Sequence, residues 1–94
     1  MSRISVQNFV SSSGNSIANQ FVINDGDREI FQSYNSVIAI KERGKKTILD
    51  SNTWNYSRTT GKYRNDFLGE NTATIRKKIE EGFYVLQNLN SIHD

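Results

Sequence analysis

Apolar and polar residues alternate along most of the chain before residue 50, as expected for a sheet with one face buried. In the run QFVIN, Phe21 and Ile23 share one face. Asp25 and Gly26 follow as a hairpin signal, because glycine accepts the positive φ of tight turns. The run EIFQSY resumes the alternation, so we expect strands at 20–24 and 29–34, with a turn or bulge near Asn35.

Other short apolar runs predict further strands. SVIAIK is continuous and rich in β-branched side chains, which favours a central strand at 36–41. KTILD predicts a short strand at 46–50, and FYVLQNL predicts a returning strand at 83–89. Near the N-terminus, Ile4 and Val6 indicate an edge strand at 3–10, and the run SSSGNS that follows predicts a mobile loop.

The period changes near residue 70, where ENTATIRKKIEEG has the features of a helix. Asn71 or Thr72 can cap the free N–H groups at the helix start. Ile75 and Ile79 lie on one face at i,i+4, and Gly82 is placed to end the helix in a left-handed conformation. A helix this short is marginal alone, so we expect its isoleucine edge to pack on the sheet.

These elements predict an α+β fold, an antiparallel β-meander of three to five strands with one short C-terminal helix packed on the sheet. The chain of 94 residues has room for one domain. We expect an edge strand and flexible segment at 1–19, a single domain at 20–90 and a tail at 91–94. Apolar residues make up only 35%, so the core should be thin and a homodimer that buries more surface is plausible.

The amino-acid composition limits the kinds of catalytic and metal-binding site that the chain can form. The chain has no cysteine, and its single histidine, His93, falls in the expected tail. No nucleotide-binding or nucleophile motif occurs, so we expect no enzyme activity, no cofactor and no metal. No apolar run approaches the roughly 20 residues of a membrane span, so we expect a cytoplasmic protein with no membrane partner.

The net charge of +2 is unevenly distributed. Between Lys41 and Arg64 there are seven cations and two carboxylates, a net of +5, which predicts a basic patch if the segment is compact. The alternative is a solvated hairpin tip and a solvated loop. If nucleic acid is the partner, the expected phosphate contacts are Lys41, Arg43, Lys45 and Lys46.

The segment WNYSRTTGKYRNDFLGE, at 54–70, combines aromatic, cationic and hydroxyl side chains. Trp54 and Tyr56 alternate as in a strand, and residues 59–61 look like a turn. One interpretation places Phe67 and Leu68 in the core, with Trp54 equally suited to core or surface. The other is an outward contact surface, because tyrosine and arginine dominate binding hot spots. Its residues would be Tyr56, Arg58, Lys62, Tyr63 and Arg64.

This segment and the following TIRKKIEEGFYVLQNLN resemble a pattern in small uncharacterised proteins of bacteriophages and mobile elements, over about residues 21–90. The resemblance implies stoichiometric binding to a host protein or protein–nucleic-acid complex, as an inhibitor of defence such as restriction or CRISPR, in the host cytoplasm. The expected architecture is also similar to sheet-based DNA readers of the AP2 and integrase arm-binding type. We therefore expect a non-enzymatic binding protein; the alternatives are a sheet-based nucleic-acid-binding domain and a structural protein that assembles through its sheet edges.

Overall fold

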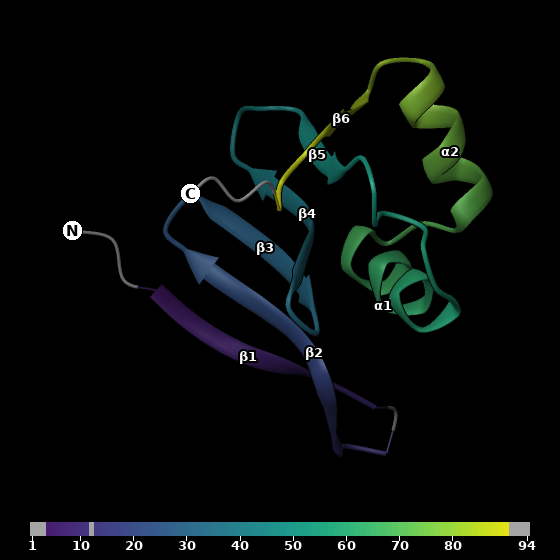
Figure 1. The fold of residues 1–94 in the computed structure, drawn as a ribbon. Coiled ribbons are helices and arrows are strands. Elements are labelled where there is room, and N and C mark those ends of the chain that lie inside the picture. Colours follow the sequence, from purple (N-terminus) through teal and green to yellow (C-terminus); the bar gives the residue numbers. More distant parts are fainter. Residues whose placement is uncertain (1–3, 12, 91–94) are drawn as a thin grey trace.

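A six-stranded sheet is the frame of the protein in the computed structural model, which describes residues 4–11 and 13–90 (Figure 1). The strands follow chain order across the sheet. The first five are antiparallel neighbours, and the sixth runs parallel to the fifth. They are β1 (Ile4–Val10), β2 (Ser16–Asp25), β3 (Arg28–Ser33), β4 (Ser36–Glu42), β5 (Thr47–Asp50) and β6 (Tyr84–Gln87).

Local turn chemistry sets the meander. Gly26 has φ 63° in the β2–β3 turn, which confirms the hairpin predicted there, and Gly44 has φ 76° in the β4–β5 turn. The register of β3 and β4 shifts between Phe31 and Gln32, and the extra residue of β4, Ile38, is completely buried. The bulge explains why SVIAIK is apolar throughout instead of alternating.

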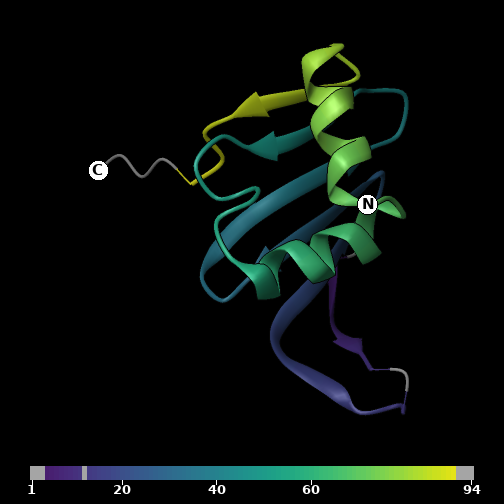
Figure 2. The same cartoon turned by 90° about the vertical axis from the view of Figure 1, so that its right-hand side faces the viewer.

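Two helices, α1 (Arg58–Leu68) and α2 (Thr72–Glu80), connect β5 to β6. Ser57 caps α1 by accepting a hydrogen bond from the Thr60 N–H at 3.1 Å, and the helix ends at Gly69 with φ 72°. Asn71 caps α2 by accepting from the Thr74 N–H at 2.8 Å, which confirms one of its two predicted caps. Both helices lie on the same side of the sheet (Figure 2).

The expected fold class is wrong in two respects, although the structure is α+β overall. The sheet has six strands and is mixed, and there are two helices, whereas three to five antiparallel strands and one helix were predicted. The turn expected at 59–61 is the first turn of α1. The sequence pattern hid this helix because Thr60 and Arg64, which are polar, share its buried face with Tyr63 and Phe67.

The core lies between the sheet and the helices. Its fully buried apolar side chains come from β3, β4, β5 and α2: Phe31, Ile38, Ala39, Leu49 and Ile75. Phe31 contacts Phe9 and Phe67 with ring centroids 5.3 and 5.8 Å apart, which connects β1 and α1 through one aromatic cluster.

The ends of the chain show a mixed outcome. The edge strand expected at 3–10 is confirmed as β1. Residues expected to form a mobile loop close a hydrogen-bonded turn, in which the Ser11 N–H donates to the Asn15 carbonyl at 2.8 Å, and β2 begins at Ser16. The tail predicted at 91–94, with His93, lies outside the described residues.

Candidate binding surfaces

The connection after β5 starts from a buried carboxylate. Asp50 accepts four hydrogen bonds, from the backbone N–H groups of Asn52, Thr53 and Leu89 and from the Thr53 hydroxyl. Burial alone raises the pKa of Asp50, but these hydrogen bonds outweigh it and hold the pKa below its ordinary value. The Asp50 side chain therefore holds two segments together by hydrogen bonds: the turn at 51–54 and the segment that follows β6.

Arg64 organises the space between this connection and the two helices. Its guanidinium is fully buried and donates five hydrogen bonds, of 2.6 to 3.3 Å, to Trp54, Asn55, Asn65 and Thr72. All four acceptors are neutral, and among the described residues Arg64 forms no ion pair. Burial, and next the charge of Arg76, lower the pKa of Arg64. The positive charge is thus hydrogen-bonded but not neutralised.

Two arginines approach the ring of Trp54. The guanidinium carbons of Arg64 and Arg76 are each 5.3 Å from the centroid of its ring. Both distances are within the range of cation–π attraction. The ring of Trp54 therefore helps to stabilise two neighbouring positive charges. The same side chain is partly buried and packs against the core.

A cleft of about 450 Å³ opens above the buried guanidinium and runs along α1 from Arg58 to Asp66. We call it the basic cleft. Asn55, Asn65 and Thr72 line it and also bind Arg64, which places the buried charge directly beneath its floor. Arg58 and Lys62 are exposed at its wall and form no ion pair among the described residues, and Asp66 is the carboxylate in its lining. The remaining lining residues are Ser57 and Gly61.

The five predicted contact residues divide into two groups. Tyr56, Arg58 and Lys62 are exposed. The expectation that Tyr63 and Arg64 face outward is wrong, since their exposures are 9% and 0%. The cause is helical geometry: residues 60, 63, 64 and 67 recur at i, i+3, i+4 and i+7, which puts them on the face of α1 that meets the sheet. That spacing was the signal in the sequence that could have found the buried face.

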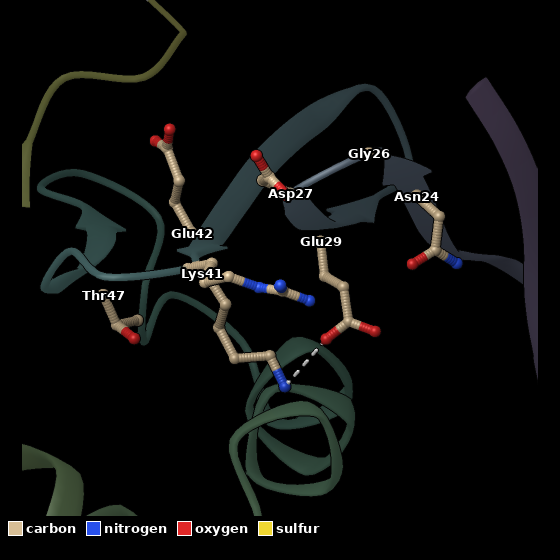
Figure 3. A pocket seen from close by; sticks show the side chains of 8 residues that line it. Asn24, Gly26, Asp27, Glu29, Lys41, Glu42 and Thr47 are labelled. Carbon is tan, nitrogen blue, oxygen red and sulfur yellow. Dashed lines mark ion pairs between the residues drawn. The ribbon is translucent and has the colours of Figure 1, made fainter. Parts of the chain in front are cut away.

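A second pocket, of about 400 Å³, lies at the β4–β5 tip, where phosphate contacts were predicted (Figure 3). Lys41 points toward Glu29 and pairs with it at 3.2 Å. The Lys41 ammonium also donates to the Phe67 carbonyl at 2.9 Å. Asp27 and Glu42 add further negative charge to the lining, and Lys45 is 3.7 Å from Glu42. Arg43 and Lys46 are exposed at the tip.

The basic patch predicted for 41–64 is therefore split. Lys41 contacts the Phe67 carbonyl at the C-terminal end of α1, whereas Arg58 and Lys62 lie in its first two turns. At a rise of about 1.5 Å per residue, Phe67 is about 14 Å beyond Arg58 and about 8 Å beyond Lys62 along the helix axis. The tip is close to neutral because of its carboxylates, which disfavours a phosphate clamp there. A net positive charge remains at the basic cleft, where Asp66 offsets one of the three cations Arg58, Lys62 and Arg64.

A third cluster joins α2 to β6. The Glu70 carboxylate accepts hydrogen bonds from the Lys78 ammonium and the Tyr84 hydroxyl. Although burial alone raises the pKa of Glu70, these two donors lower it below the ordinary value. Burial and the neighbouring carboxylate raise the pKa of Tyr84. All three side chains are occupied by one another, so the cluster holds elements together and offers no free group.

Within 4–11 and 13–90, no three His, Cys, Asp or Glu side chains come together as metal ligands would. Neither of the two described helices has the length and apolar character needed to cross a membrane.

The fold and its clefts define a small mixed α+β domain with one basic cleft. Residues 4–82 match the model of the family of unknown function DUF8033, and the chain belongs to this family. No curated protein and no solved structure matches the chain.

Proposed function

We propose that this protein is a non-enzymatic binding protein that docks an acidic segment of a host macromolecule, preferably a protein, into the basic cleft. The observation that carries the proposal is the net positive charge: Arg58 and Lys62 at the wall and Arg64 buried beneath the floor with neutral partners only, against the single carboxylate of Asp66. The proposal assigns no chemical step, cofactor or metal to the cleft.

Electrostatic attraction favours an acidic ligand in this cleft. A carboxylate that enters it meets two exposed cations, the single carboxylate of Asp66, and the field of Arg64, which water screens less because that side chain is buried. Neutral hydrogen-bond donors and acceptors in the lining can orient it, and the half-exposed Tyr56 beside it offers the amphipathic ring typical of hot spots. The cleft is compact, which suits one or two acidic side chains better than a long polyanion.

Nucleic acid is the second candidate because two aromatic rings, Trp54 and Tyr56, lie in the same connection as the cleft. Such rings can stack on bases while cations contact phosphates. The sheet-based version of this candidate has less support. On the sheet face away from the helices, Arg28 is bound to Asp25 at 2.8 Å, so its guanidinium is already engaged.

The biological setting also belongs to the proposal. The resemblance to small phage and mobile-element proteins favours an inhibitor that titrates host defence machinery, such as restriction or CRISPR complexes, in the host cytoplasm. Stoichiometric inhibition needs only a rigid surface of matched charge and shape, which a small domain can supply.

The experiment compares two double charge reversals. Arg58→Glu with Lys62→Glu changes the cleft, whereas Arg43→Glu with Lys46→Glu changes the tip and serves as the matched control. Each protein is used for affinity capture from host lysate with and without nuclease, followed by titration of the recovered partner. We expect the cleft variant to lose affinity about tenfold or more and the tip variant to keep it.

The outcomes separate the candidates. If the partner is still captured after nuclease treatment and the cleft variant fails to capture it, the partner is a protein that binds through an acidic segment. Capture abolished by nuclease, with affinity for oligonucleotides that falls steeply as salt increases, supports nucleic acid instead. A cleft variant that is folded and retains its partner as well as wild type would overturn both.

A further inference from the structure

The face of the sheet opposite the helices carries a continuous apolar row. Cross-strand pairs connect one residue from each strand in an unbroken series. From β1 to β6 the row is Val6, Ile23, Ile30, Ile40, Ile48 and Val85. Its members are separate from the core: Phe31, Ala39 and Leu49 are buried on the helix side, and their sequence neighbours in the row point the other way.

This composition is unusual for a solvated sheet face, which normally carries polar residues at alternate positions. All six members are β-branched and apolar, and every one is at least partly exposed, with Val6 at 59%. Both helices lie on the other side of the sheet (Figure 2). The row therefore has the chemistry of an inner face of a sheet sandwich, but no described helix covers it.

The rows on either side add no uncompensated positive charge. One contains Asp25, Arg28 and Glu42, in which the first two form an ion pair at 2.8 Å. The other contains Asn8, Phe21 and Gln32, which are neutral. An anionic partner is thus not favoured. Another flat apolar row is the natural match, and the same row on a second copy is self-complementary under two-fold symmetry.

The size of this sheet face is compatible with pairing between two copies. Five inter-strand steps of about 4.8 Å make the row about 24 Å long, and flanking rows widen it to about 20 Å. The flat area of the three rows together is then on the order of 500 Å², the same order as the roughly 800 Å² per partner of a standard interface.

We propose that the protein forms a homodimer by packing this apolar row against the same row of a second copy, as two face-to-face sheets with the helices outermost. This inference goes beyond the proposed function, since the basic cleft lies in the helical layer and remains open in such a dimer.

The test is the mass in solution, measured by sedimentation equilibrium from low to high micromolar concentration. Wild type should reach twice the chain mass of 10.8 kDa. Ile40→Lys should be monomeric, because it buries an ammonium at the centre of the interface. Val6→Glu, at the exposed end of the row, should raise the dissociation constant about tenfold. Lys77→Glu, which changes the charge on α2 by two units against one unit in each row variant, should stay dimeric.

Circular dichroism and urea unfolding establish that each variant is folded. A wild type that stays monomeric at high micromolar concentration overturns the proposal. So does a folded Ile40→Lys that is still dimeric, since Ile40 is in an interior strand and pairing of edge strands would not involve it. If Ile40→Lys does not fold, Val6→Glu decides: an unchanged dissociation constant overturns the assigned face.

Discussion

At the scale of single residues, Arg64 shows how a polar side chain can be structural. Its planar guanidinium reaches the 54–55 connection, its helix neighbour Asn65 and the start of α2 at once. A buried cation without a carboxylate is costly, so these hydrogen bonds must offset its desolvation. The same residue contributes charge beneath the basic cleft, which links local stability to the proposed binding.

We expect Arg64→Lys to lower the free energy of unfolding by about 2–4 kcal/mol, because an ammonium cannot reproduce the fork that satisfies all four acceptors. Urea unfolding measures this. The exposed Arg58→Lys is the matched control and should change stability by less than about 0.5 kcal/mol. Equal stability of the two variants would show that Arg64 does not hold the connection together.

Asp50 makes a prediction about pH. Its pKa is lower in the folded state than in the unfolded chain, so its contribution is complete above about pH 4, the ordinary aspartate pKa, and is lost as pH falls through the folded pKa. Asp50→Asn should lower the free energy of unfolding by about 2–3 kcal/mol at pH 7. The gap from wild type should shrink below pH 4, as measured by urea unfolding at each pH. A gap that stays constant down to pH 3 would contradict this role.

At the scale of elements, α2 was predictable and α1 was not. The cap at Asn71, the buried Ile75 and Gly82 with φ 84° all follow from residue types at the right spacing. In α1, by contrast, the buried face contains Thr60, whose hydroxyl is 2.9 Å from that of Ser33 in β3, and Arg64. A polar residue becomes a core residue only when its partner is in place, and the partner is distant in sequence.

The docking of α2 allows a graded test of the predicted isoleucine edge. Ile75 is fully buried, so Ile75→Ala should lower the free energy of unfolding by about 2–5 kcal/mol through lost burial and a cavity. Ile79 is only partly buried and packs at the edge of the core, so Ile79→Ala should cost about 1 kcal/mol. Chemical denaturation compares the two. Equal losses would indicate that the helix is rotated relative to this arrangement.

At the scale of the whole molecule, the sheet separates two surfaces of different character. The helical layer carries the basic cleft, and the opposite face carries the apolar row. If the row pairs two copies, each dimer presents two clefts, and a partner with two acidic segments would gain avidity. The unfolding temperature becomes concentration-dependent as well.

A 100-fold increase in protein concentration should stabilise the dimer by about 2.7 kcal/mol and raise the unfolding midpoint by several degrees. Differential scanning calorimetry over that range measures the shift. Ile40→Lys, if folded, should show a midpoint independent of concentration. If the unfolding midpoint of the wild type is also independent of protein concentration, the protein unfolds as a monomer.

The sequence by itself determined the strands and the second helix, because alternation, turn glycines and capping residues act over a few positions and need no distant partner. It also determined which residues are cationic. The tertiary structure decided which cations remain free: it buried Arg64, occupied Lys41 and left Arg58 and Lys62 at a cleft. Strand register, which depends on contacts between segments far apart in the chain, likewise brought six separate β-branched residues into one row.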